Sequence, residues 1–155
     1  MSRFVVLVFL FLTATGIASG SLAWASSAQA DDEQALAVAR DVVMRERGRL
    51  ARQVQETKDF MARARLTADK ARELQHAIGR WEATMAAYDV TLSEGPKRAL
   101  VLAAKAVVHG QLEQLYAARV KNPKQNDEQS PKREQALLDE LKLLEDWQGK
   151  SSKTP

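Results

Sequence analysis

Two basic side chains in the middle of the chain stand at a spacing that could serve a binding site. Arg47 and Lys58 are eleven residues apart, which is close to three turns of an α-helix, so both would lie on one side of it. Further along, the segment LTADKARE carries Asp69, Arg72 and Glu73. Fixed positive groups of this kind can orient an anionic substrate and stabilise developing negative charge without a nucleophile or metal.

A further cation stands in the most apolar part of the sequence. Lys105 lies inside LVLAAKAVV, where a charged side chain must extend to solvent, pair with an acid or face a pocket. The alternative for all these charges is an ordinary solvated surface, because acidic and basic residues alternate along the predicted helices.

The segments that carry these residues resemble the all-helical chorismate mutases, a family with an exported branch. ERGRLARQVQETK is similar to the first active-site helix, LTADKARE to the loop and helix start that supply an Asp, an Arg and a Glu, and AAKAVVH to the later helix that brings a Gln or Glu. The resemblance implies that Arg47, Lys58 and Arg72 contact the carboxylates and ether oxygen of a small dianion, and that Glu73 holds a hydroxyl. The other substrate contacts that it implies are Asp69, Lys105 and His109.

A second resemblance concerns the start of the same segment. LTADK, residues 66–70, is similar to the LT-x-x-Q signature of small periplasmic helical stress proteins with chaperone or metal-sensor roles, with Lys70 in place of Gln. It implies a function in binding other proteins.

The sequence predicts no metal and no cofactor. His76 and His109 fall on different predicted helices, and the chain has no cysteine. A zinc site needs three or four converging ligands, which no spacing here provides. A bundle that binds a small ligand, or a haem held between a Met and a His, remains a third hypothesis.

The first thirty residues have the features of a cleaved signal peptide. Arg3 precedes the apolar run FVVLVFLFL, and Ala28 and Ala30 occupy the small-residue positions before DDEQ. We therefore expect a mature chain from Asp31, localised to the periplasm or secreted, with no stable membrane anchor after cleavage. Its balance is 22 basic against 20 acidic residues, and without a basic stripe nucleic acid is not an expected partner.

The remaining pattern is helical throughout. Apolar residues of 71–92 repeat at alternating spacings of three and four, as in helix-on-helix packing. Residues 33–92 form either one long helix or two, and Thr67 favours a break because it can cap a second helix. Gly95 and Pro96 end this region. We expect a helical core domain at 31–120 with a central helix from 96, a polar linker at 121–133, a C-terminal helix at 134–148 and a disordered tail at 149–155.

The fold class is therefore all-α, a three- to four-helix bundle or a long antiparallel hairpin. The simplest function for it is an exported protein that acts through helix–helix interactions, as a chaperone, sensor or assembly module. Its partner would be a second copy in a homodimer or another periplasmic protein. Aromatic residues dominate contact energies, so the expected anchors are Trp81, Tyr88, Tyr116 and Trp147. The alternative is the chorismate-mutase-like enzyme.

Overall fold

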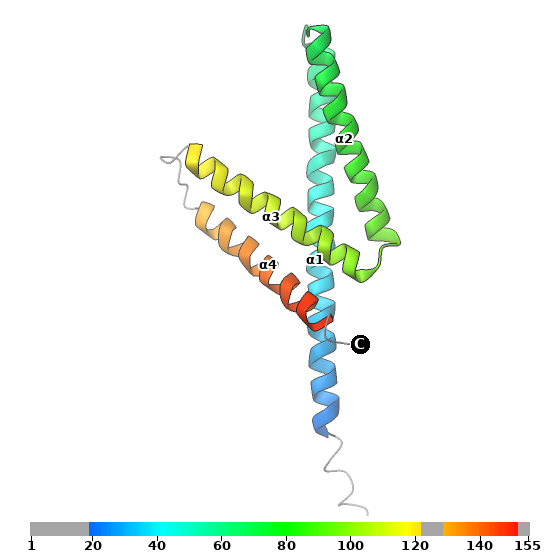
Figure 1. The fold of residues 1–155 in the computed structure, drawn as a ribbon, viewed down its shortest axis with the longest axis vertical. Helices are drawn as coiled ribbons and strands as arrows, with labels where there is room; N and C mark the ends of the chain where they lie inside the picture. Colours follow the sequence, from blue (N-terminus) through cyan, green and yellow to red (C-terminus); the bar gives the residue numbers. More distant parts are fainter. Residues whose placement is uncertain (1–18, 122–128, 152–155) are drawn as a thin grey trace, which may run out of the picture. The chain divides into compact units, whose positions relative to one another are not determined.

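The structure, a computed structural model, describes residues 19–121 and 129–151 as four α-helices (Figure 1). They are α1 (Ser19–Arg63), α2 (Ala68–Ser93), α3 (Lys97–Lys121) and α4 (Gln129–Ser151). These residues contain no strand, so the predicted all-α class is confirmed.

The chain divides into two compact units at Gln34–Ala35. In the first unit, the described part is the beginning of α1, where Gln29 Nε2 donates to Glu33 Oε1 at 3.4 Å. The charged and apolar segments of the predicted signal peptide fall in residues 1–18, outside the described residues. Within the described ranges, no helix combines the length and the hydropathy that a membrane crossing requires.

Residues 33–92 form two helices, as the sequence favoured, because the chain breaks between Arg63 and Ala68. Thr67 is the N-cap of α2, with an extended backbone at φ −67° and ψ 155°. Its hydroxyl accepts a hydrogen bond from Lys70 N at 3.3 Å, which satisfies one of the free N–H groups at the helix start. Asp69 lies in the first turn, where a negative charge is favourable.

A tight connection joins α2 to α3. Glu94 N donates to Val90 O at 2.9 Å and closes the last turn of α2. Pro96 O then accepts from Ala99 N at 2.8 Å and from Leu100 N at 3.2 Å, so α3 starts directly after the proline. The predicted stop at Gly95–Pro96 is confirmed.

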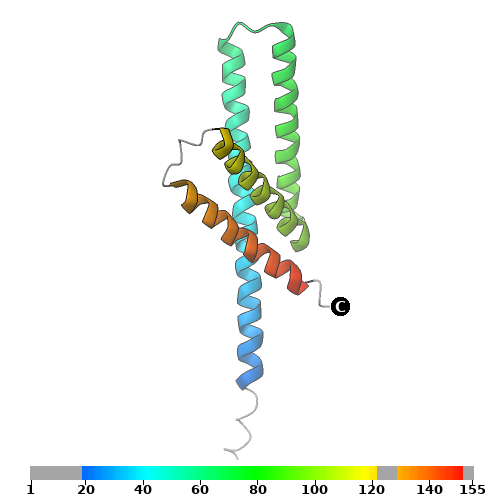
Figure 2. The same cartoon turned by 60° about the vertical axis from the view of Figure 1, so that its left-hand side comes forward.

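The hydrophobic core of the second unit is built around α3. Figures 1 and 2 show α3 and α4 side by side against the middle of α1, while α2 runs back along α1. This confirms the predicted central role of α3, whose nearly all-round apolar start is covered by two other helices. The buried residues of this cluster are Ala35, Ala39, Val42 and Val43 of α1; Leu100, Val101, Ala104, Val107, Val108 and Leu112 of α3; and Leu137, Leu144 and Trp147 of α4.

The last helix is longer than the predicted 134–148, because it begins at Gln129 and ends at Ser151. Its first turn is held to the end of α3, where Arg119 Nε donates to Ser130 Oγ at 3.2 Å and Arg119 Nη2 lies 2.6 Å from Glu134 Oε2. Gly149, the first residue of the predicted tail, continues in helical conformation. Of the predicted linker, residues 122–128 lie outside the described residues, as do residues 152–155 of the tail.

Gly79 gives a first test of this fold. It lies within α2, and a Cβ built on it meets no atom within 4 Å. We expect Gly79→Ala to raise the free energy of unfolding by about 0.5–1 kcal/mol, because alanine loses less backbone entropy in a helix. Urea unfolding followed by circular dichroism measures this change. Destabilisation would mean that another group packs closely against this face of α2.

Candidate functional site

The cations expected to share a substrate are paired separately along the α1–α2 hairpin. Arg47 Nε and Nη2 donate to Asp89 Oδ1 and Oδ2 at 2.5 and 2.9 Å, and this contact holds the pKa of Asp89 below its ordinary value. Lys58 Nζ donates to Glu82 Oε1 at 2.8 Å. Both ion pairs join α1 to α2 on the exposed surface, so each cation is neutralised by its own carboxylate.

The acid–arginine–acid group of LTADKARE forms local pairs in the first turn of α2. Arg72 Nη2 lies 2.7 Å from Asp69 Oδ1, and Lys70 Nζ lies 2.7 Å from Glu73 Oε2. All four side chains are exposed. Pairs three residues apart support a helix by a few tenths of a kcal/mol, so their role here is local.

Lys105 and His109 lie on α3, away from these pairs. Lys105 Nζ donates to Gln148 Oε1 at 2.9 Å and lies 3.5 Å from Glu145 Oε1, both on α4. Of the three outcomes expected for this lysine, pairing with an acid is therefore the one observed. His109 is exposed, and the neighbouring Val108 is fully buried in the core. His76 is exposed on α2.

The four aromatic residues expected as partner anchors have different environments. Trp147 is buried in the core, where it packs with residues of α1 and α3. Tyr88 is partly buried against that core. Tyr116 is exposed, but its hydroxyl donates to Glu134 Oε1 at 3.0 Å and its ring lies 5.9 Å from Arg119 Cζ. Trp81 is half-buried on the α1–α2 hairpin and remains available.

A polar cluster occupies the junction of the first three helices. Glu46 of α1 accepts from Arg49 Nε at 2.9 Å and from Arg49 Nη2 at 2.6 Å. These hydrogen bonds, with a smaller contribution from Gln111 of α3, hold the pKa of Glu46 below its ordinary value, although partial burial acts in the opposite direction. Burial raises the pKa of the nearby Tyr88 hydroxyl.

The lowered pKa of Glu46 predicts a loss of stability in acid. A carboxyl whose pKa is lower in the folded state stabilises the fold above its unfolded pKa, and this contribution disappears as the pH falls through the folded value. Glu46→Gln should therefore reduce the dependence of the unfolding free energy on pH below about pH 4.3, the ordinary value for Glu. Urea unfolding at a series of acidic pH values tests this. Unchanged pH dependence would place the titrating groups elsewhere.

Beyond the core, the hairpin continues as a two-helix arm, which we define as residues 51–85. Figures 1 and 2 show that neither α3 nor α4 extends to the tip of this arm, where α1 ends and α2 begins. In the arm, Val54 and Ile78 are buried, whereas Met61, Leu74 and Trp81 are only partly buried and Phe60 is 50% exposed. Two helices alone leave the apolar seam of the arm incompletely covered.

A hollow of about 370 Å³ lies on the face of the arm between α1 and α2. Met61, Ile78 and Gly79 form its apolar part, and the missing side chain at Gly79 helps to open it. The paired Lys58 and Glu82 line it as well, together with Gln75. We call this feature the arm hollow.

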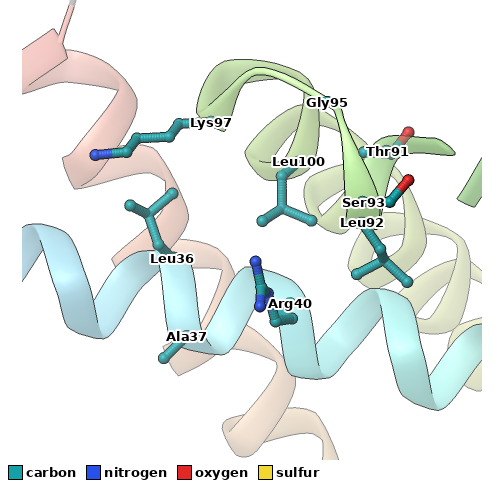
Figure 3. Close-up of a pocket in the computed structure, with 9 residues that line it drawn as sticks. All are labelled: Leu36, Ala37, Arg40, Thr91, Leu92, Ser93, Gly95, Lys97 and Leu100. Carbon is teal, nitrogen blue, oxygen red and sulfur yellow. The ribbon is translucent and has the colours of Figure 1, made fainter. Parts of the chain in front are cut away.

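A second hollow of about 370 Å³ lies where α1 passes the α2–α3 connection (Figure 3). We call it the proximal hollow. Its apolar lining comes from Leu36, Ala37, Leu92 and Leu100, and the rest from Arg40, Thr91, Ser93, Gly95 and Lys97. Figure 3 shows Arg40 rising from α1 beneath Leu100, whereas the Lys97 side chain runs from the start of α3 past Leu36, away from Arg40.

The chain was compared with protein-family models, curated proteins and solved structures, and no match was found. The described residues also contain no group of three or more His, Asp or Glu side chains placed to hold a metal ion. The arm and these two hollows are features of the described chain that could serve a function.

Arg40 and Lys97 line one hollow only in the folded chain, so the sequence did not single them out. Each stands next to one other charged residue in a helix-forming segment, so neither its type nor its spacing distinguishes it. The arm hollow was not predicted from the sequence either. Gly79 was the available signal, because a glycine inside a regular apolar repeat leaves space on the helix surface.

Proposed function

We propose that this chain is an exported helical protein that acts through helix–helix interactions, as a chaperone, sensor or assembly module, and that the arm is its contact surface. The observation that carries the proposal is the incompletely covered apolar seam of the arm. Met61, Leu74 and Trp81 keep part of their surface in solvent, because neither α3 nor α4 reaches this part of the arm. A helix from a partner would bury these side chains, just as α3 and α4 bury the part of α1 between Ala35 and Val43.

The arm hollow gives the seam a specific shape. A side chain from a facing helix could enter between Met61 and Ile78 above Gly79, as knobs enter holes in packed helices. The rim offers a paired lysine and glutamate, which matches the apolar centre and polar edge of ordinary protein interfaces.

No observation favours the enzyme alternative. Arg47, Lys58, Arg72 and Lys105 each have their own polar partner, and neither hollow is lined by more than one of the four. A site for a dianion requires several of these charges to converge on the same atoms.

Export of the chain forms part of the same proposal. The second compact unit begins at Ala35, four residues after the proposed mature start at Asp31, so removal of residues 1–30 leaves that unit whole. Intact-mass measurement on the protein recovered outside the cytoplasm should give the mass of residues 31–155, and Ala30→Arg should prevent this processing. Recovery of an unprocessed chain in the cytoplasm would contradict export.

The contact surface is tested by two matched substitutions in the purified protein. Phe60 of the arm and Leu102 of α3 are similarly exposed, at 50% and 45%. Self-association is measured by sedimentation equilibrium, and chaperone activity by suppression of the aggregation of reduced insulin. We expect Phe60→Asp to weaken whichever activity is present by about tenfold, because a charge would replace a large exposed apolar side chain of the arm.

Leu102→Asp is the control and should leave the same activity within about twofold, since scattered exposed apolar residues contribute little to binding. Equal losses in the two variants would contradict a role for the arm. A monomer without any effect on aggregation would contradict the chaperone and homodimer forms of the proposal.

A further inference from the structure

We propose that the α1–α2 hairpin, of which the arm is the outer part, binds the hairpin of a second copy of this chain, with the two arms parallel. This names the partner for the contact role proposed above, and it rests on that role. The surface concerned is the face with the ion pairs Arg47–Asp89 and Lys58–Glu82, which we call the ion-pair face. Its exposure, its shape and its charge support a second copy as the partner.

The ion-pair face is open to solvent. On α1, Arg47 and Lys58 are eleven residues apart, so they point within about 20° of each other. On α2, Glu82 and Asp89 are seven residues apart and agree in direction to about 20° as well. All four side chains are between 43% and 51% exposed. Ala39 of the core is turned from the two cations by about a quarter turn of α1, so the core packs against a different side of this helix.

Short side chains stand at matching levels on the two helices of this face. On α1 an alanine follows each cation by four residues, and on α2 an alanine or a glycine precedes each acid by three. These residues are Ala51 and Ala62 of α1, and Ala86 and Gly79 of α2. Because α2 runs back along α1 (Figures 1 and 2), both steps lead toward the tip of the arm and differ by only about 1.5 Å. Where α1 of one copy faces α2 of the other, these short side chains would allow the helices to approach closely.

Larger apolar side chains border the same face at its lower end. Met44 stands three residues before Arg47 on α1 and is 56% exposed, and Val90 follows Asp89 on α2 and is 61% exposed. Between Met44 and the end of α1 at Arg63 the face is about 30 Å long, and two helices side by side are about 20 Å wide. Two such faces would bury roughly 1,200 Å² in total, the lower end of the range for specific interfaces.

The distribution of charge selects the arrangement of the two copies. Both cations of the face belong to α1 and both acids to α2. With a two-fold axis along the arms, α1 of each copy faces α2 of the other, so every cation meets an acid at its own level. With antiparallel arms α1 would face α1, and Arg47 would meet Lys58 of the second copy. Like charges placed opposite each other oppose association, so the parallel arrangement is the one that this face fits.

Charge reversal in the purified protein tests this arrangement, with self-association measured by sedimentation equilibrium. We expect a dimer with a dissociation constant on the order of 10 µM, as for a small interface. Lys58→Glu and Glu82→Lys should each weaken it by at least about tenfold, because four like charges would meet. An equal mixture of the two variants should recover the dimer, since the acids of one copy face the cations of the other. Loss of the ion pair within each copy would not be repaired by mixing.

Lys70→Glu is the matched control. The Lys70 side chain is 50% exposed, like that of Lys58, and it forms an ion pair with Glu73 at 2.7 Å. It is turned from Glu82 by about a third of a turn of α2, so it lies off the ion-pair face. Its reversal should change self-association by less than about twofold.

Single cysteines report which helices face each other, because the chain has no cysteine of its own. Under mild oxidation, a mixture of Ala51→Cys and Ala86→Cys should give a disulfide-linked dimer, since these positions are level on facing helices. Ala51→Cys alone should give little, because parallel arms place the two α1 helices diagonally. Circular dichroism of each variant confirms that it is folded.

Four results would overturn the parallel dimer. They are a monomer at about 100 µM, no recovery on mixing the charge-reversed variants, equal weakening by Lys70→Glu, and more crosslinking of Ala51→Cys alone than of the mixture. A dimer strengthened by Lys58→Glu would mean antiparallel arms and would also contradict it. If the protein is monomeric and Phe60→Asp still abolishes its effect on aggregation, the contact role of the arm stands and the partner is another protein.

Discussion

Leu144→Ala should lower the free energy of unfolding by about 2–5 kcal/mol, the range for truncating a fully buried leucine. Leu144 is completely buried in the C-terminal half of α4, in the cluster that joins this helix to α1 and α3. Alanine would remove both the transfer free energy of the lost carbons and their packing, and would leave a cavity. Chemical denaturation followed by circular dichroism gives the change directly.

Leu138 of the same helix provides the matched control. It is 39% exposed, so Leu138→Ala should lower the free energy of unfolding by less than about 1 kcal/mol. Both substitutions change helix propensity equally, and the difference between them isolates burial. Equal effects would show that α4 does not pack on the core through the face that carries Leu144.

Gly95→Ala should destabilise the fold by about 1–3 kcal/mol, the range for overpacking at a site without free space. A Cβ at this position would lie 2.5 Å from Thr91 O and 2.8 Å from Thr91 Cα. Both atoms belong to the backbone of the last turn of α2, so the clash cannot be relieved by rotating a side chain. The chain must move at the α2–α3 connection, which also lines the proximal hollow.

Gly110→Ala is the comparison for this effect. Gly110 lies within α3, and a Cβ there meets no atom within 4 Å. The substitution should therefore be neutral or stabilising, as expected for Gly79→Ala. If Gly95→Ala were as stable as Gly110→Ala, the connection would not have the close approach to Thr91 seen here.

The helices were predictable because their signals are local. Thr67 before an acidic first turn, and Gly95–Pro96 after a long apolar repeat, identify helix ends through hydrogen bonds within a few residues. The two ends of α4 were not predictable in this way. Its start is fixed by contacts of Arg119 with Ser130 and Glu134, which come from another helix, and Gly149 did not end it.

The candidate site was harder to predict from the sequence than the helices, because it depends on which charged residues form ion pairs in the fold. Arg47 and Lys58 do lie on one side of α1, as their spacing predicted, but Asp89 and Glu82 of α2 face them and neutralise them. A spacing rule identifies the shared side of a helix and not what packs opposite. Arg40 and Lys97 show the converse, since nothing in their own segments indicates that they line one hollow.

Site-specific photocrosslinking in intact cells tests the central claim, that the arm is the contact surface of an exported protein. Benzoylphenylalanine is placed at position 60 of the arm or at position 102 of α3, which are similarly exposed. The account predicts a discrete crosslinked product outside the cytoplasm from position 60, none from position 102, and loss of the product when Gly79→Phe fills the arm hollow. Equal crosslinking from both positions, or none from position 60, would contradict it.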